Sequence, residues 1–405
     1  MKVILLVNPP SPFLISPIAF PPLGLLYLAA VVENAGHKVE IVDLAAGDSL
    51  AGHNPDLIGV TVCTTHVPMV KALLARIRVE YPSVPIVLGG PHFSHKPLDA
   101  ALLGVDTVCV GDGEQAILRA LRGEKGILKG LVEMEDVPMP ARHVVDLYRY
   151  NYKINNLPAT SLITSKGCPY ACAYCCRGYG YDTLRNHPLS LVAAEVEDIK
   201  KLGFTAVMIY DDEMNISNRR LSDVCDVLKG LQWRGFVRSN LFTIAQAVTM
   251  QEAGCVEVCC GVESGSDRIL QNCNKRATVK DATNTRKIAA SVGLRFKSFM
   301  MIGLPGETEE SVAQTKLWLL QHLPDDFDIS PYIPYPGSAV SNNPENYDIV
   351  IDGSYWDEIY YHKGKIGEYH INSHTSGLTA ARILELRDDI EISVRKAIND
   401  NKMAV

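Results

Sequence analysis

Three cysteines near the middle of the chain have a spacing that suits iron–sulfur chemistry. Cys168, Cys172 and Cys175 form a Cys-x3-Cys-x2-Cys triplet. Three thiolates on one short loop can bind three corners of a four-iron cluster, which usually takes four Cys ligands, so the fourth iron is left open for a substrate or cosubstrate. Structural zinc is the alternative, but zinc prefers paired Cys-x2-Cys units and the chain has no second pair suitably placed. We expect Cys176 to be a packing thiol, because adjacent residues do not easily reach two corners of one cluster.

The elements that must position this triplet alternate strand and helix patterns. Six such units predict a partial parallel barrel, whose functional groups lie at the carboxyl ends of its strands. The Cys loop follows the first of these strands, as this architecture requires. The expected strands are residues 161–164, 206–210, 236–238, 256–261, 295–302 and 327–331, with helices that include 191–202 and 308–321.

Charged and small residues follow the later strands. Asp211, Asp212 and Glu213 end the second strand, where three acids repel one another unless a cation is present. The alternative is an acid-rich helix start, which the helix dipole favours. Arg238, at the third strand, could bind an anion or close a surface ion pair. The fourth strand ends in Glu263 and Ser264, where the Ser suits a helix cap, and the fifth ends in Gly303 and Leu304, where the glycine permits close backbone approach.

The first 125 residues predict a doubly wound α/β domain. Fully apolar strands at 3–7, 39–43, 57–62, 86–88 and 107–110 between helices indicate a parallel sheet covered on both faces. Its ligand should lie at the carboxyl ends of the strands. The loops contain neither a G-x-G-x-x-G fingerprint nor a P-loop, which disfavours a dinucleotide or a triphosphate. The candidate residues at those ends are Asn8, Pro9, Pro10, Thr64, Thr65, Gly89, Gly90, His92, Gly111, Gly113 and Glu114, of which His92 is either a metal ligand or a hydrogen-bonding loop residue.

Length and composition limit the class of protein. At 405 residues the chain is long enough for two or three domains, and 47% hydrophobic with 21% charged residues is ordinary for a globular protein. The net charge of −7 argues against a nucleic-acid-binding surface. No run approaches the roughly 20 apolar residues that cross a bilayer, and the N-terminus lacks the signature of a secretory peptide. We therefore expect a cytoplasmic protein, in which clustered Cys are metal ligands rather than disulfides.

Both halves of the chain resemble the cobalamin-dependent radical S-adenosylmethionine (SAM) enzymes, the branch that includes methyltransferases and the anaerobic magnesium-protoporphyrin ester cyclase. The resemblance covers about residues 1–335. The first half departs from classical cobalamin-binding domains, because it has no Asp-x-His-x-x-Gly motif to ligate cobalt; that absence is usual in this branch. The absence of this motif leaves the alternative that the first domain has the cobalamin-binding fold but binds no cobalamin. The resemblance rests on residues 8–10, 22–29, 35–37, 55–59, 89–92 and 111–114, then on the Cys triplet, 211–212, 263–265 and 303–307.

The resemblance implies the architecture and the cofactors. We expect a Rossmann-like cobalamin-binding domain (1–125), a connector (126–158), a radical SAM partial (β/α)6 barrel (159–337) and a short, mainly helical C-terminal segment (338–405). The cofactors are a [4Fe-4S] cluster on the triplet, SAM, and cobalamin at the strand-end residues of the first domain. The SAM-binding residues are Tyr174 near the adenine, one of the acids Asp211, Asp212 and Glu213 at the amino group, Arg238, Glu263 at the ribose, Ser264, and the backbone of Gly303 and Leu304.

The implied function is methyl transfer. A 5′-deoxyadenosyl radical abstracts hydrogen from a small-molecule substrate, and methylcobalamin supplies the methyl group. A cyclase or rearrangement enzyme without methyl transfer is the alternative, and a non-catalytic cobalamin or cluster sensor is the third interpretation. We expect a low-potential donor such as flavodoxin or ferredoxin, no nucleic acid or membrane partner, and a monomer.

Overall fold

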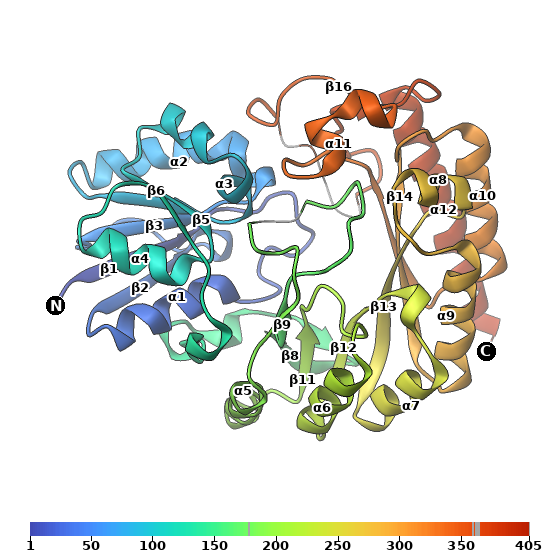
Figure 1. Ribbon diagram of the computed structural model, residues 1–405, viewed down its shortest axis with the longest axis horizontal. Helices are drawn as coiled ribbons and strands as arrows, with labels where there is room; N and C mark the ends of the chain where they lie inside the picture. The colour runs from blue at the N-terminus through green and yellow to red at the C-terminus, as the bar shows by residue number, and fades with distance from the viewer. Residues whose placement is uncertain (177–178, 359, 361–364, 405) are drawn as a thin grey trace.

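Two parallel β-sheets lie side by side in the computed structural model, which describes residues 1–176, 179–358, 360 and 365–404. Figure 1 shows the N-terminal sheet with its helices on the left and the second sheet on the right. The order of strands and helices along the chain agrees with the predicted α/β class.

The first sheet has six parallel strands in the order β2-β1-β3-β4-β5-β6. Its strands are apolar runs because both faces are covered. The sequence pattern does not predict β6, since Leu128 is its one buried residue and glycines stand at both ends. The strands are β1 (Val3–Asn8), β2 (Lys38–Asp43), β3 (Leu57–Thr61), β4 (Ile86–Gly89), β5 (Thr107–Gly111) and β6 (Gly126–Gly130).

Alternate residues of each strand enter different cores. Ile4 and Leu6 of β1 pack with helices α1 and α4, whereas Leu5 and Val7 face α2 and α3. The sheet is therefore the middle layer of three. The helices are α1 (Leu23–Asn34), α2 (Val67–Glu80), α3 (Pro91–His95) and α4 (Gly113–Leu121).

The second sheet contains six parallel strands, as predicted, and one antiparallel edge strand, in the order β15-β14-β13-β12-β11-β8-β7. The predicted ranges 161–164 and 236–238 are wrong in their bounds, because β8 and β12 each begin four residues earlier. The edge strand β7 joins β8 through Asn155 and Asn156, both at positive φ, which suits a two-residue hairpin turn. The sheet curls into an open half-barrel (Figure 1). Its strands are β7 (Lys153–Ile154), β8 (Leu157–Leu162), β11 (Ala206–Ile209), β12 (Gln232–Val237), β13 (Cys255–Glu263), β14 (Arg295–Ile302) and β15 (Asp326–Pro331).

Helices cover the outer face of the half-barrel, and Trp233, Phe296 and Phe327 from three strands join them in the largest core. A two-stranded hairpin, β9 (Ser165–Lys166) with β10 (Arg185–Asn186), frames the loop that carries the Cys triplet. The helices are α5 (Leu189–Lys201), α6 (Asn218–Leu228), α7 (Ile244–Glu252), α8 (Asp267–Asn272), α9 (Val279–Ser291) and α10 (Glu309–Gln321).

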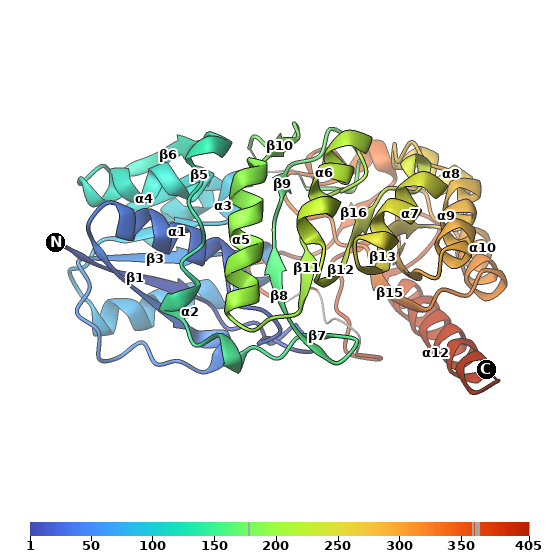
Figure 2. The same cartoon turned by 90° about the horizontal axis from the view of Figure 1, so that it is seen from below.

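A buried ion pair joins the two domains. Arg142 follows the first sheet, and its NH2 lies 2.7 Å from Oε1 of Glu195 on α5. The Tyr27 hydroxyl of α1 donates to the same carboxylate at 3.2 Å. Figure 2 shows α5 between the first domain and the half-barrel. Because Arg142 and Glu195 are fully buried, this contact fixes how the domains meet.

The C-terminal part returns to the first domain. Tyr355 and Trp356 pack edge-on against the buried ring of His92. The remaining elements are α11 (Ala339–Asn342), β16 (Val350–Ile351), β17 (Ser373–His374) and α12 (Ala380–Ala404).

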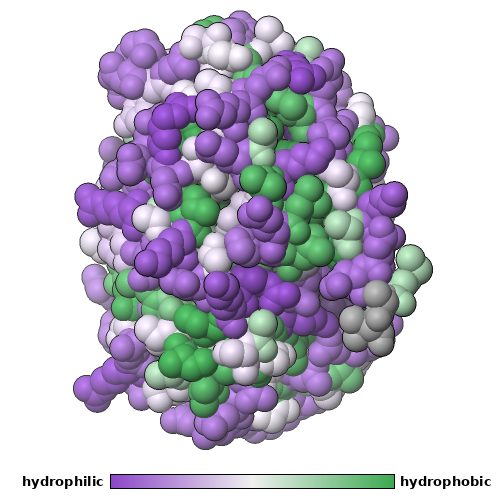
Figure 3. Space-filling view, turned by 90° about the vertical axis from the view of Figure 1, so that its right-hand side faces the viewer, coloured by the Kyte–Doolittle hydropathy of each residue, from purple (hydrophilic) through white to green (hydrophobic). Residues whose placement is uncertain are grey.

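The outer side of the half-barrel, seen in Figure 3, has hydrophobic patches scattered among hydrophilic residues. Among the described residues, none of the helices combines the length and apolar character that a membrane span needs.

Candidate active site and cofactor-binding sites

The predicted cluster ligands share one cavity. Cys168, Cys172 and Cys175 line a space of about 260 Å³ at the carboxyl ends of the barrel strands. The Cys168 N–H donates to the Tyr181 carbonyl at 3.0 Å, which fixes the start of the loop. Gly167 has a φ of +90°, and a Cβ there would collide with the Thr183 carbonyl, so this turn requires glycine.

The triplet differs from a single-ion site. Within the parts of the chain that the structure describes, no group of three or more His, Cys, Asp or Glu is arranged to hold one metal ion. The assignment of the three thiols to a cluster remains a prediction. Cys176 is exposed, although burial by surrounding groups raises the pKa of its thiol, so the packing role that we expected for it stays a prediction.

The three acids after β11 have separate surroundings. Asp211 accepts four hydrogen bonds, two from Thr164 and two from Ser165, and it does not line the cavity. Asp212 accepts from the Gly167 N–H at 2.9 Å and does line it. Glu213 also lines it, and its Oε2 has no hydrogen-bond partner among the described residues. Burial raises the pKa of Glu213 to about 7, so a cationic ligand would favour its ionised form.

A second group of charges crosses the same cavity. Oε1 of Glu263 lies 3.0 Å from Nζ of Lys275 and accepts from the Tyr174 hydroxyl at 3.2 Å. Glu263 has a φ of +68°, an uncommon conformation for a residue with a side chain. The Arg238 guanidinium lies 3.6 Å from the centre of the Tyr170 ring and donates to the Lys275 carbonyl. Backbone strain and paired charges together fix the Glu263 carboxylate.

The other residues predicted to bind SAM make structural contacts within the protein, and their role toward SAM stays a prediction. Ser264 is fully buried, and its hydroxyl lies 3.3 Å from that of Thr315. The Gly303 and Leu304 N–H groups donate to the buried carboxylate of Glu307. None of these residues lines the cavity that holds the Cys triplet.

Glycines line a separate cavity in the first domain. It has a volume of about 250 Å³ and lies at the carboxyl ends of β1, β3, β4 and β5. A Cβ on Gly90 would lie 2.7 Å from the Val62 carbonyl oxygen, and one on Gly111 would collide with the Gly130 carbonyl. Both positions therefore require glycine, because neighbouring backbone lies where a Cβ would be. The predicted residues that line it are Gly89, Gly90, Gly111, Gly113 and Glu114.

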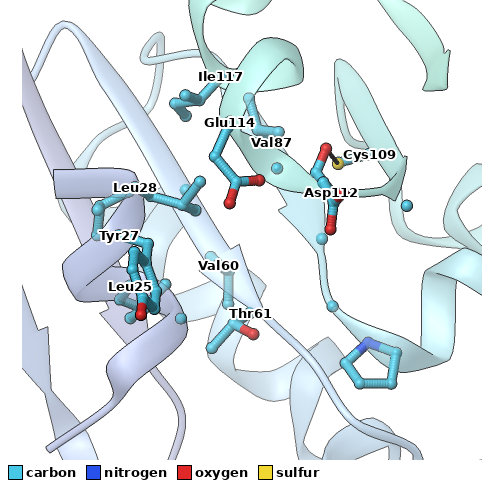
Figure 4. A pocket seen from close by; sticks show the side chains of 18 of the residues that line it. Leu25, Tyr27, Leu28, Val60, Thr61, Val87, Cys109, Asp112, Glu114 and Ile117 are labelled. Atoms are coloured by element: carbon cyan, nitrogen blue, oxygen red, sulfur yellow. Dashed lines mark hydrogen bonds between the residues drawn. The ribbon is translucent and has the colours of Figure 1, made fainter. Parts of the chain in front are cut away.

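The walls of this cavity are apolar and its charges are few. Figure 4 shows Leu28 and Val60 on the walls, with the carboxylates of Asp112 and Glu114 directed into the space. A flat apolar ring with a polar attachment, such as the benzimidazole nucleotide of cobalamin, suits both features. The donor set and the glycines thus fit the cofactor that the sequence predicts.

The remaining predicted cobalamin residues lie at the same sheet edge but do not line the cavity. The Asn8 amide donates to Asp43 at 2.8 Å. Nδ1 of His92 lies 3.2 Å from the Thr64 hydroxyl, and burial lowers the pKa of His92 to about 4, so the ring is neutral. His92 is thus a buried hydrogen-bonding residue here. The others are Pro9, Pro10 and Thr65, whose hydroxyl lies 3.0 Å from the Cys63 sulfur.

Lys275, Lys166 and Tyr181 are among the lining residues that the sequence patterns did not indicate. Lys275 lies in the turn between α8 and α9, away from any strand end, so no pattern indicates it. Lys166 and Tyr181 belong to the barrel half of the chain but line the cavity of the first domain. Lys166 stands two places before Cys168, so the sequence shows its position beside the Cys triplet. The sequence does not show its contact with the first domain.

Two family models match the chain, each over one of the domains described above. The B12 binding domain matches residues 18–121, and the radical SAM superfamily matches residues 162–319. The first match runs from the loop before α1 to the end of α4, and the second from the end of β8 into α10.

Relatives of known name match across both domains. An uncharacterized methyltransferase, PH0819, from Pyrococcus horikoshii is 28% identical over 85% of this chain and 84% of its own length. A cytidylyl-2-hydroxyethylphosphonate methyltransferase from Streptomyces wedmorensis is 24% identical over 72% and 71%. The anaerobic magnesium-protoporphyrin IX monomethyl ester cyclase from Rubrivivax gelatinosus is 21% identical over 79% and 65%.

Among solved structures, the radical SAM methyltransferase TsrM from Kitasatospora setae has a TM-score of 0.72 at 18% identity, covering 98% of this chain and 89% of that one. At this identity the likeness shows the fold.

The chain is thus an α/β enzyme with a cofactor-binding domain ahead of a radical SAM half-barrel. It belongs to the radical SAM enzymes that carry a B12-binding domain. The predicted fold class and the predicted cofactors, a [4Fe-4S] cluster, SAM and cobalamin, are confirmed at this level. Two of the three named relatives are methyltransferases, in agreement with the predicted methyltransferase activity.

Proposed function

We propose that this enzyme transfers a methyl group to a carbon of a small-molecule substrate. The observation that carries the proposal is the position of the glycine-lined cavity, which residues of the Cys-bearing hairpin help to line. When bound, the cluster and SAM supply a radical that removes a hydrogen atom, and cobalamin supplies the methyl group that replaces it.

The residues of the barrel cavity divide the work of binding. Cys168, Cys172 and Cys175 bind three irons. Asp212 and Glu213 attract the SAM amino group, because both carboxylates line the cavity beside the thiols. Arg238 and Lys275 supply positive charge for the SAM carboxylate.

The first domain positions its cofactor by shape. Gly89, Gly90 and Gly111 leave room against the sheet, and the apolar walls exclude water from the bound group. Precise placement matters, because a misplacement of about 1 Å can reduce a rate roughly a hundredfold.

The test uses protein reconstituted with iron, sulfide and hydroxocobalamin, then incubated with SAM and a low-potential reductant. Methyl transfer predicts both 5′-deoxyadenosine and S-adenosylhomocysteine. 5′-Deoxyadenosine alone would support the second candidate, a cyclase or rearrangement enzyme, which the similarity to the ester cyclase favours. Absence of both products would overturn both, leaving the sensor interpretation.

We also propose a cytoplasmic monomer that receives electrons from flavodoxin or ferredoxin and binds no nucleic acid. All eleven cysteines are free thiols, as a reducing compartment allows. Gel filtration with light scattering tests the monomer, and reduction of the cluster by flavodoxin, monitored by absorbance, tests the donor.

A further inference from the structure

Ile163, Lys166 and Tyr181 of the barrel line the cavity of the first domain, and the placement of the two polar residues among them has consequences for both cofactors. We propose that Lys166 and Tyr181 complete the cobalamin site from the barrel side and couple its occupancy to that of the cluster loop. This inference rests on the proposed function, because it takes the glycine-lined cavity as the cobalamin site.

Lys166 balances the charges at the mouth of that cavity. Its Nζ lies 3.3 Å from Oδ1 of Asp112 and 3.3 Å from Oε1 of Glu114. Arg185 on the same hairpin gives Asp112 a second cation at 2.7 Å. Within the described residues, Lys166 is the cation that pairs with Glu114, and the two side chains are only 11% and 7% exposed. Water therefore screens these charges weakly.

The negative charge on the phosphate of the proposed ligand, cobalamin, makes this balance of charges necessary. The nucleotide tail of cobalamin carries a phosphodiester, and Figure 4 shows the Glu114 carboxylate directed into the cavity. Without Lys166, the buried carboxylate would repel the phosphate and would itself be uncompensated. Lys166 is therefore a positioning residue for the cofactor of the other domain.

The same residues hold the start of the cluster loop. Lys166 precedes Cys168 by two residues, and the Gly167 between them donates its N–H to Asp212 at 2.9 Å. Tyr181 lines the cavity, while its carbonyl accepts from the Cys168 N–H at 3.0 Å. A ligand that contacts Lys166 is thus two residues along the chain from the cluster-binding Cys168. A ligand that contacts Tyr181 is one hydrogen bond away from the same cysteine.

Such a connection acts in both directions. A cofactor in the cavity favours the arrangement in which Lys166 and Tyr181 are in place, and the cluster favours the same arrangement from its side. Because the coupling free energy between two sites is reciprocal, each cofactor should raise the affinity for the other by the same factor.

The experiment compares hydroxocobalamin binding, followed by absorbance, to full-length protein with and without the reconstituted cluster. We expect the dissociation constant to be about tenfold lower with the cluster present. Lys166→Met should raise it by about tenfold or more and remove the difference between the two forms. Lys166→Arg, which keeps the charge, should restore most of both effects.

Lys129→Met is the matched control, since Lys129 is an exposed residue on the neighbouring strand β6. It should bind hydroxocobalamin as the wild type does. Equal affinities of the wild type with and without the cluster would overturn the coupling, whether or not Lys166→Met folds. Failure of the wild type to bind hydroxocobalamin in either form would instead overturn the cobalamin site of the proposed function.

Discussion

The cavity of the first domain and the cavity of the barrel have similar volumes, about 250 and 260 Å³, and mainly apolar walls, but they differ in the polar groups among those walls. Six glycines and an apolar wall form the first, with charges gathered at its mouth. Thiols and charged side chains, including Glu213, Arg238 and Lys275, form the second. Both cavities lie at the carboxyl edge of a parallel sheet. The fold therefore determines where a site lies, and the side chains determine which ligand it can bind.

The two linings recognise ligands differently. A space made by missing side chains selects by shape, so an added side chain should weaken binding without disturbing charge. A lining of paired charges selects by complementarity, so a lost charge or hydrogen bond should weaken binding without filling space. The following predictions test this contrast, beginning with the largest effect.

Replacing Cys168, Cys172 and Cys175 together by Ala should abolish the barrel site and spare the other. We expect complete loss of cluster absorbance, iron content and SAM cleavage, because no thiolate remains to bind iron. Cobalamin should still bind, weakened by about the tenfold coupling factor. Cys176→Ala is the control and should keep its cluster. A triple variant that retains stoichiometric iron and sulfide would contradict the ligand assignment.

Arg142→Met tests whether the two regions fold as one unit. The variant leaves the buried Glu195 carboxylate without its ion pair, so the free energy of unfolding should fall by about 3–5 kcal/mol. Arg119→Met, which breaks a partly exposed pair with Glu124, should change it by less than about 1 kcal/mol. Urea denaturation measures both. Equal effects of the two variants would show that the domain junction lies elsewhere.

Much of this contrast was predictable from the sequence. Apolar runs and helical periodicity indicate a strand at all six places in the barrel, but β12 and β15 alternate buried and partly exposed residues, and β8 and β12 begin four residues before their predicted starts. The Cys triplet predicts its own site by spacing alone. The glycines at positions 89, 90 and 111 were predicted as lining residues, since close backbone approach needs a missing side chain.

What the sequence did not reveal depends on contacts between distant segments. Lys275 and Lys166 carry no local signature, and each acts only because the fold brings it beside carboxylates from other elements. Asp211 shows the converse case. It belongs to a suggestive acidic run, yet its four hydrogen bonds come from Thr164 and Ser165 and join the end of β11 to the segment after β8.

The two sheet edges should also differ in how pH affects stability. Burial raises the pKa of Glu307 in the barrel to about 7, above an unfolded value near 4.5. Between these values the folded state keeps a proton that the unfolded state has released, so stability falls as pH rises from about 4.5 to 7. Burial opposes ionisation of Asp112 as well, but the hydrogen bond from Arg185 and the charge of Lys166 outweigh it and lower its pKa. The ionised Asp112 carboxylate therefore adds to the free energy of unfolding above the ordinary pKa of an Asp side chain. This contribution is lost in acid, when the carboxylate takes up a proton.

Urea denaturation of the cofactor-free protein at pH 5 and pH 8 measures this difference. Glu307→Gln should be more stable than the wild type at pH 8, by an amount on the order of 3 kcal/mol, and similar to it at pH 5. The same stability difference at both pH values would disprove the ionisation argument.

Gly24→Leu should fill the cavity of the first domain. Gly24 lines that cavity in α1, and no atom lies within 4 Å of a Cβ placed there, so the helix accepts the side chain. Overfilling costs about 1–3 kcal/mol, which corresponds to a roughly 5- to 150-fold weaker hydroxocobalamin affinity. Gly24→Ala should have a smaller effect, and neither variant should have a lower melting temperature, because Ala and Leu both favour a helix over glycine. Unaltered binding by the Leu variant would place cobalamin elsewhere.

Tyr174→Phe should have the smallest effect, and it separates two roles in the charged cavity. The hydroxyl donates to Glu263 at 3.2 Å, while the ring is the feature that the sequence assigns to the adenine. Losing one such hydrogen bond costs about 0.5–1.5 kcal/mol, so the dissociation constant for SAM should rise by roughly two- to tenfold. Tyr174→Leu, which also removes the ring, should bind SAM more weakly still, and Tyr148→Phe, at an exposed position, should bind as the wild type does. If the Phe variant binds SAM normally and the Leu variant does not, the ring alone recognises SAM, and shape contributes to the charged cavity as well.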